Sequence, residues 1–431
     1  MSAPLTPFLG VREVASRLTG SAADYDHLLE MARAKRYVLL GEATHGTREF
    51  YQTRADITRQ LIVQGGFDAV AIEGDWPDAW RINRYVQGEG TDTAAEALGD
   101  FQRFPEWMWR NREMLDFITW LHAHNAALAT PQRVGVYGLD LYSLYRSAEA
   151  VVEYLQKTDP EQAAVARMHY AALDHVREPM TYGYEAAAGL RLPAQREVIE
   201  QLRRFRASEA RLIEQDGTAA IDSHFFAEQN AIVVVNAEAY YRESFGRRVN
   251  TWNLRDAHMA QTLFGLAAYR QRRGGDGRIV VWAHNSHVGD ARATESASRH
   301  EWNLGQLVRE QVGGAALLVG FTTYTGHVCA ASEWGGEAER KWVRPARPDS
   351  WEHLFHSTGL DRFFLPLGDA AADVFREPLL ERAIGVLYLP KTEYASHYFD
   401  AAIGAQFDAL VHLDETSAIE PLSTLSTALL P

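Results

Sequence analysis

A glutamate and a histidine stand three residues apart in the stretch Gly-Glu-Ala-Thr-His-Gly at residues 41–46. A carboxylate that binds one ring nitrogen of a histidine fixes the tautomer of the ring and makes the other nitrogen a better base. Glu42 and His45 are therefore candidates for activating a water molecule. They follow an apolar run at residues 37–40, which is typical of a buried strand, so we expect the pair at the end of that strand.

Two other apolar runs end in groups of the same kind. Glu73 comes at the end of the run that begins at residue 69, and His284 and His287 follow the run 278–283. Because ligands bind beyond the carboxyl ends of the strands in open parallel sheets, we expect these side chains to gather at one edge.

An arginine on the helix that follows the first strand has an informative position. Arg54 lies four residues after Phe50 and three before Ile57, on the helix face that should point to the core. A lone buried guanidinium is costly, so Arg54 should pair with a carboxylate. Glu42 and Glu73 are the two partners we expect, and the pair has either a structural or a substrate-anchoring role.

Further polar side chains stand where a ligand could be contacted. Asp140 and Tyr142 follow a third apolar run, Arg255 opens a helix that leads back toward the sheet, and Tyr324 ends the run 316–324. We predict that these four residues contact substrate.

A metal centre is the alternative use of the same carboxylates and imidazoles. Zinc takes nitrogen and oxygen ligands and can lower the pKa of a bound water. The residues that would then bind a divalent metal such as zinc are Glu42, His45, Glu73, His284 and His287.

The elements that must position these residues read as a parallel sheet with helices on both faces. The apolar runs are rich in β-branched residues and lack alternation, which favours strands covered on both sides. Strands are expected within 37–46, 69–76, 133–142, 278–290, 316–326, 385–390 and 409–414. The segment 47–68 reads as a helix, ended by Gly65 and Gly66, that joins the first two strands.

We expect a helical insertion and a small α+β subdomain beside the α/β core. The segments 194–215 and 223–245 are rich in Ala, Glu, Arg and Leu and have helical character. The predicted division gives a catalytic core, a helical insertion and an α+β subdomain. The core comprises 1–149, 273–327 and 391–431, the insertion 150–272, and the subdomain 328–390.

Composition and missing motifs exclude several functional classes. The formal charge of −14 and the lack of a basic run argue against nucleic acid as a partner. The single cysteine, Cys329, excludes an internal disulfide framework and is expected to be a packed thiol. No signal peptide or membrane span is apparent, so a cytoplasmic protein is expected. The sequence also lacks the G-x-S-x-G nucleophile elbow and the phosphate-binding glycine motifs.

The motifs together resemble the erythromycin esterase family, some of whose members are called succinoglycan biosynthesis proteins. The resemblance spans roughly residues 10–420. It is carried by the segments LLGEATHGTREFYQTRADITRQLI, AIEGDW, GLDLYSLY, LRDAHMAQ and VVWAHNSHVGD. The resemblance implies a hydrolase that opens macrolide lactone rings, with His45 as general base supported by Glu42. It also implies that Arg54, Glu73, His284 and His287 belong to the essential set.

We therefore predict hydrolysis of an ester or lactone by a water that His45 activates, without a covalent acyl-enzyme and without a cofactor. Arg54 and one of His284 and His287 would stabilise the oxyanion, and Glu73 would hold them in place. The partner is then a small-molecule ester or lactone. A metal-dependent hydrolase and a non-catalytic binding protein are the alternatives.

Overall fold

The computed structural model of the protein describes residues 7–173, 178–246, 249–368 and 375–422. The chain forms two compact units. The first comprises residues 1–72, 82–136 and 270–431, and the second comprises residues 73–81 and 137–269. The three-part division drawn from the sequence stays a prediction.

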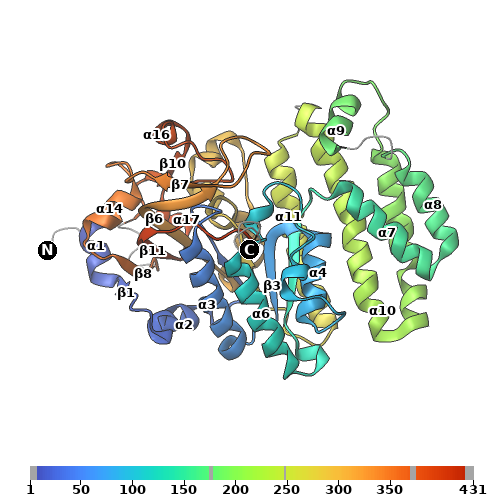
Figure 1. The fold of residues 1–431 in the computed structure, drawn as a ribbon, viewed down its shortest axis with the longest axis horizontal. Coiled ribbons are helices and arrows are strands. Elements are labelled where there is room, and N and C mark those ends of the chain that lie inside the picture. Colours follow the sequence, from blue (N-terminus) through green and yellow to red (C-terminus); the bar gives the residue numbers. More distant parts are fainter. Residues whose placement is uncertain (1–6, 174–177, 247–248, 369–374, 423–431) are drawn as a thin grey trace, which may run out of the picture. The chain divides into compact units, whose positions relative to one another are not determined.

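A mostly parallel sheet organises the first unit (Figure 1). In the described part of the chain its strands follow the order β1-β8-β11-β6-β2-β5-β3-β4, and β7 pairs with β6. The strands are β1 Ser16–Arg17, β2 Tyr37–Leu40, β3 Ala69–Asp75, β4 Gly135–Asp140, β5 Ile279–Trp282, β6 Ala316–Ala330, β7 Glu339–Val343, β8 Arg362–Pro366 and β11 Ala409–Thr416. Strands β2, β3, β5, β6 and β11 pair in parallel, whereas β1, β7 and β8 pair antiparallel. The predicted α/β fold is confirmed.

A two-stranded sheet stands beside the large one. It consists of β9 Leu379–Arg382 and β10 Tyr398–Ala401. The strand predicted at 385–390 is wrong, because this segment makes only an isolated bridge through Leu387 to Ala331. Its residues instead cover the end of β6, and Tyr388 lies in the small core cluster there.

The described residues also form helices of widely different length. They are α1 Pro7–Val14, α2 Asp26–Ala32, α3 Arg48–Gly65, α4 Trp76–Val86, α5 Ala94–Ala97, α6 Arg112–Ala126, α7 Leu144–Thr158, α8 Pro160–Tyr170, α9 Pro179–Ala187, α10 Gln195–Gly246, α11 Thr251–Arg272, α12 Asn285–Val288, α13 Leu304–Val312, α14 Trp351–Ser357, α16 Glu393–Ser396 and α17 Ile403–Gln406. None of these described helices combines the length and apolar composition that a membrane crossing requires.

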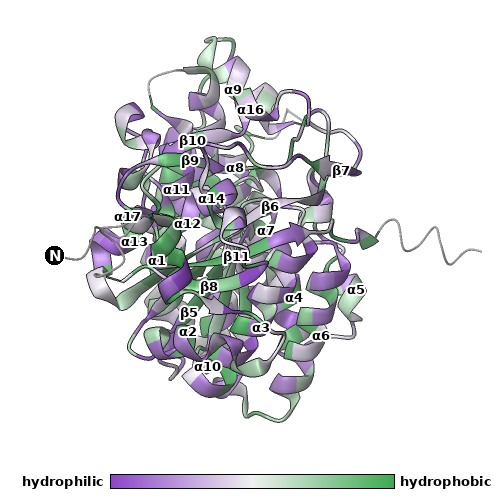
Figure 2. Cartoon of the chain, turned by 90° about the vertical axis from the view of Figure 1, so that its left-hand side faces the viewer, coloured by the Kyte–Doolittle hydropathy of each residue, from purple (hydrophilic) through white to green (hydrophobic). Residues whose placement is uncertain are grey.

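Apolar burial accounts for the position of the sheet. All four residues of β2 and of β5 are buried, as the uninterrupted apolar runs predict. Strands at the centre of Figure 2 are accordingly largely green, while the helices alternate between green and purple. Helix α3 buries Phe50, Arg54 and Ile57 on one face, and Gly66, with a φ of 68°, ends it in the left-handed conformation.

Long helices make up most of the second unit. Helix α10 runs for 52 residues, and α7 and α9 pack along it (Figure 1). The two helical segments predicted at 194–215 and 223–245 are therefore one continuous helix. No glycine or proline stop separates them except Gly217, which a long helix tolerates at about 1 kcal/mol.

Candidate active site

The loop after β2 is held in place by backbone contacts on both sides. Ile384 donates its N–H to Ala43 O at 2.8 Å, and His45 donates to Ile384 O at 3.3 Å. Gly46 O accepts from the N–H of Cys329 at 3.0 Å, and a Cβ at position 46 would lie 1.9 Å from Cys329 O. Only glycine permits this approach to β6, so the loop that carries His45 is rigidly packed.

Glu42 joins His45 to Arg54. Its Oε1 lies 2.9 Å from His45 Nδ1, and its Oε2 accepts from Arg54 Nη2 at 2.7 Å. Glu42 and Arg54 are fully buried, and His45 is 7% exposed. The carboxylate thus favours the tautomer of His45 that carries its proton on Nδ1, which leaves Nε2 as the basic nitrogen.

Arg54 lies between aromatic rings. Its guanidinium carbon is 4.5 Å from the ring centre of Tyr51 and 5.1 Å from that of Trp282. The structure decides between the two expected partners in favour of Glu42. Because Arg54 is completely enclosed, its contact with Glu42 is a positioning contact, and the positive charge stabilises the buried carboxylate.

A second imidazole lies beside the first. The ring centres of His45 and His284 are 4.9 Å apart. His284 caps α12, and its Nδ1 accepts from the backbone N–H of Ser286 at 3.2 Å and lies 2.8 Å from Ser286 Oγ. Since Nδ1 accepts, a neutral His284 carries its proton on Nε2 and is a hydrogen-bond donor there. The two rings therefore have complementary states, a base in His45 and a donor in His284.

Helix α12 itself is tied to the Glu42 loop. The N–H of Asn285 donates to Glu42 O at 2.8 Å, and the Asn285 side chain donates to Phe321 O at 2.8 Å and accepts from Phe321 N at 3.1 Å. His287 is buried in the same short helix. The sequence pointed to both histidines, whereas the anchoring role of Asn285 became visible only in the structure.

The second unit contains a group of charged residues of its own. Arg255 Nη2 contacts Glu73 Oε1 at 2.7 Å and Asp140 Oδ2 at 2.6 Å, and its Nε contacts Asp140 Oδ1 at 3.0 Å. Tyr142 lies under the guanidinium, 5.1 Å from it. Within this unit Glu73 is thus a partner of Arg255.

Burial shapes the ionisation of this group. Desolvation opposes the charge on Asp140, but Arg255 outweighs it, so the pKa of Asp140 is lowered. Burial also raises the pKa of the Tyr142 hydroxyl well above its usual value. Asp140 and Arg255 are therefore a charged pair with a neutral phenol beside them.

Tyr324 belongs to a different environment in the first unit. Its ring stacks on His356 with centres 3.7 Å apart, and its backbone oxygen accepts from Arg382 at 2.9 Å. His356 in turn contacts Asp414 at 2.9 Å. A substrate role for Tyr324 stays a prediction.

Cys329 is the packed thiol that was expected. It is buried, and burial raises its pKa to about 12. A thiol in this state is a poor nucleophile.

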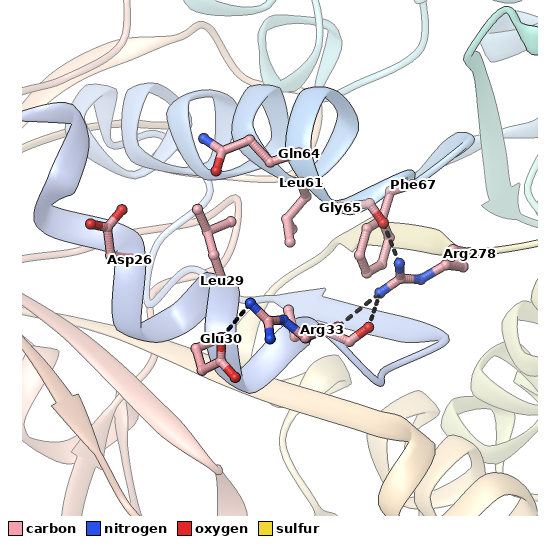
Figure 3. Close-up of a pocket in the computed structure, with 10 residues that line it drawn as sticks. Asp26, Leu29, Glu30, Arg33, Leu61, Gln64, Gly65, Phe67 and Arg278 are labelled. Atoms are coloured by element: carbon pink, nitrogen blue, oxygen red, sulfur yellow. Dashed lines mark hydrogen bonds and ion pairs between the residues drawn. The ribbon is translucent and has the colours of Figure 1, made fainter.

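One surface cavity of about 290 Å³ lies between α2, the end of α3 and the start of β5 (Figure 3). It is lined by Asp26, Leu29, Glu30, Ala32, Arg33, Leu61, Gln64, Gly65, Phe67 and Arg278. Arg278 points to backbone oxygens, including those of Ala32 and Arg33 at 2.9 Å. The cavity adjoins the segment that precedes β5, whereas His284 follows β5, and it contains none of the predicted site residues.

The proposed metal set can be compared with the geometry. Across residues 7–173, 178–246, 249–368 and 375–422, no group of three or more His, Cys, Asp and Glu side chains is arranged to hold a metal ion. Both Glu42 oxygens are engaged, by His45 and by Arg54. Each oxygen of this carboxylate thus has a protein partner in the structure.

Comparison with known proteins identifies the family. The family model described as erythromycin esterase matches residues 62–416. The chain belongs to the erythromycin esterase family. Membership of this family supports an esterase-like hydrolase, and the predicted resemblance is confirmed.

The relatives of this erythromycin esterase family member have low sequence identity, but the alignments with them cover most of the chain. An erythromycin esterase type II of Escherichia coli is 20% identical over 92% of this chain and 93% of its own. A putative hydrolase, YbfO, of Bacillus subtilis strain 168 is 21% identical over 91% of this chain and 86% of its own.

Solved structures show the same fold. A succinoglycan biosynthesis protein has a TM-score of 0.78 and 20% identity, and covers 97% of this chain and 100% of its own. A mutant of the erythromycin esterase EreC in its open conformation has a TM-score of 0.67 and 16% identity, over 91% of this chain and 94% of its own. At these sequence identities, the similarity to solved structures establishes the fold of this protein.

Proposed function

We propose that the protein hydrolyses a carboxylic ester, a lactone in the first instance, with water as the nucleophile and His45 as the general base. The observation that carries this proposal is the buried chain from Arg54 through Glu42 to Nδ1 of His45. These hydrogen bonds leave Nε2 of His45 ready to take a proton from water. Family membership supports the esterase class.

His284 is assigned to the developing oxyanion. Its Nδ1 accepts from Ser286, so the proton on its Nε2 can be donated to the carbonyl oxygen under attack. Arg54 takes a positioning role in this scheme because it is fully buried against Tyr51 and Trp282. This differs from the direct oxyanion role expected from the sequence.

The substrate is proposed to be a macrolide or a simpler lactone. A relative that covers nearly the whole chain is named an erythromycin esterase, which favours ring lactones over linear esters. Asp140, Tyr142 and Arg255 of the second unit and Tyr324 of the first remain proposed substrate contacts.

The test is mass spectrometry of purified protein incubated with macrolides of different ring size and with simple lactones. We expect a product heavier by one water and no acylated protein in the intact mass during turnover. His45→Ala should remain folded and lose activity by about 10²–10⁴-fold. His27→Ala, an exposed histidine on α2, is the matched control and should match the wild type.

Three outcomes would contradict the proposal in different ways. Wild-type turnover by His45→Ala would refute the general base. An acyl adduct would replace direct water attack by covalent catalysis. Saturable binding with unaltered ligand after long incubation would indicate a binding protein.

We further propose that the reaction needs no metal ion. Elemental analysis of protein purified without a histidine tag should find no stoichiometric divalent metal, and incubation with a chelator should leave turnover unchanged. A bound ion whose removal abolishes activity, and whose return restores it, would establish the metal-dependent alternative.

A further inference from the structure

Glu381 is a buried carboxyl group close to α12 that has no place in the scheme above. It lies on β9 and is completely buried. Its Oε1 accepts a hydrogen bond from Asn285 Nδ2 at 3.1 Å. Asn285 is the residue whose N–H binds Glu42 O and whose side chain binds Phe321 of β6. Glu381 therefore supports Asn285, the residue that connects the Glu42 loop to the helix that His284 caps.

The groups around Glu381 include no cation that neutralises it among the described residues. Helix α14 presents Glu352, which is also fully buried, and α17 presents the uncharged Gln406. Strand β10 places Phe399 opposite Glu381. Arg382, the next residue of β9, directs its side chain to Glu393 and to Thr323 O. An ionised Glu381 would thus face a second carboxylate in a buried site.

The hydrogen-bond pattern points to a proton on Glu381. Within the described structure, Glu381 Oε2 is a buried acceptor with no hydrogen-bond partner of good geometry. A buried acceptor without a donor is unfavourable by about 1–3 kcal/mol. A proton on Glu381 Oε2 removes the charge from this buried oxygen.

From this arrangement, and resting on the proposed function, we infer that Glu381 is a positioning residue that acts as a neutral carboxylic acid. Its role is to hold Asn285 in place, and through Asn285 to fix the positions of His284 and His287 relative to Glu42. Ionisation of Glu381 would place a negative charge next to Asn285 of α12. This charge would disturb His284, the proposed hydrogen-bond donor to the oxyanion. The site would then have an alkaline limit set by a residue that does not touch substrate.

The electrostatics of the site agree with this role. Burial, followed by the charge of Glu352, raises the pKa of Glu381 to about 8, and this effect outweighs the hydrogen bonds from Gln406 and Asn285, which favour the charged form. Above that value the neutral form decreases about tenfold for each pH unit.

The first test is the pH dependence of kcat for wild type, Glu381→Gln and Glu381→Ala. Wild-type kcat should fall above about pH 8. Glu381→Gln, which is uncharged and can still accept from Asn285, should lack that fall and exceed the wild type by about tenfold one unit above the pKa. Glu381→Ala should lower kcat at every pH, with little change in KM, because Asn285 loses its partner.

Glu352→Gln is the matched control, since Glu352 is buried beside Glu381 but binds the N–H of Arg382 at 2.9 Å. It removes a neighbouring negative charge, so the alkaline fall should persist and shift to lower pH. An unchanged alkaline fall in Glu381→Gln, or a full loss of activity in that variant with normal unfolding, would overturn the inference.

A second measurement does not depend on turnover. Infrared difference spectra between about pH 6 and about pH 9 should show the carbonyl band of a protonated carboxylic acid in wild type that is missing in Glu381→Gln. If no ester is hydrolysed but this band is present, the proposed function fails while the neutral state of Glu381 stands. If the band is missing from wild type, the inference fails whatever the activity.

Discussion

At the scale of residues, the decisive arrangement is a carboxylate held between an imidazole and a guanidinium. Glu42 is fully buried, and its charge is tolerated because Arg54 neutralises it at 2.7 Å. Without that cation the carboxylate that orients His45 would be a buried charge with no cationic partner. Arg54 thus affects stability and chemistry through the same contact.

Replacing Arg54 should therefore be severe. We expect Arg54→Met to lower the free energy of unfolding by about 3–5 kcal/mol, because it leaves an unpaired buried charge. The double variant Glu42→Gln with Arg54→Met should lose less than the sum of the single variants. Urea unfolding measures these differences.

The control for Arg54 lies on the same helix. Arg59 pairs with Asp56 at the surface, at 2.8 Å, and Arg59→Met should change stability by less than about 1 kcal/mol. Equal losses of stability in Arg54→Met and Arg59→Met would contradict this prediction. Strict additivity in the double variant of Glu42 and Arg54 would also contradict it, because it would show that the buried pair contributes no coupling energy.

Sequence reasoning was effective for these residues where a periodic pattern constrained them. The position of Arg54 between Phe50 and Ile57 predicted a buried arginine with a carboxylate partner, and the structure has both. Glu381 gave no such signal, since an acidic residue in a short mixed strand usually faces solvent. Its burial depends on α14 and α17, which meet β9 only in the folded chain.

At the scale of elements, the loop between β2 and α3 determines where His45 lies. Backbone hydrogen bonds to Ile384, Cys329 and other segments hold it, and Gly46 lies against the backbone of β6. A rigid loop of this kind keeps a catalytic side chain in one place at low entropic cost during the reaction.

We expect Gly46→Ala to be damaging despite its size. The added methyl group meets the backbone of Cys329 at 1.9 Å, so the loop must move away from β6. A loss of about 1–3 kcal/mol in stability is expected, together with a fall in kcat. Gly314→Ala is the control, because a Cβ there meets nothing within 4 Å. Normal kcat and thermal stability in Gly46→Ala would indicate that the loop adapts.

Elements were predictable where they bury a continuous apolar run. Strands β2, β3, β4 and β5 fall within the predicted ranges, whereas β6 and β11 begin where predicted and run past the predicted ends, to Ala330 and Thr416. The apolar run 385–390 resembles them, but it packs across the end of β6 and makes only a bridge. The antiparallel strands β1 and β8 and the long continuous helix α10 were not foreseen, since strand pairing and helix length depend on tertiary partners.

At the scale of the whole molecule, a buried histidine makes the stability of the protein sensitive to acid. In the second unit, burial lowers the pKa of His258 to about 4. A depressed histidine pKa means that the unfolded chain takes up the proton first. The contribution to stability is therefore complete above about pH 6.5 and is lost as the pH falls toward about 4.

The expected loss from this histidine is on the order of 3 kcal/mol across that range. His258→Gln should show a shallower decline of unfolding free energy between pH 7 and pH 4 by roughly this amount. The exposed His27→Gln serves as control and should follow the wild-type slope. Identical slopes for all three proteins would show that the pKa of His258 is not lowered in the native state.

The order of strands in the sheet has a consequence for synthesis. Strand β2 pairs only with β5 and β6 in the described sheet, and Tyr37 meets Ile279, roughly 240 residues later in the chain. At typical translation rates of about 5–20 residues per second, the apolar β2 leaves the ribosome tens of seconds before a partner strand exists. The helices of residues 137–269 emerge in that interval and can fold from local contacts. Nascent chains therefore carry an exposed, aggregation-prone strand while the helical unit is already formed, which makes early chaperone binding at residues 37–40 an expected part of its biogenesis.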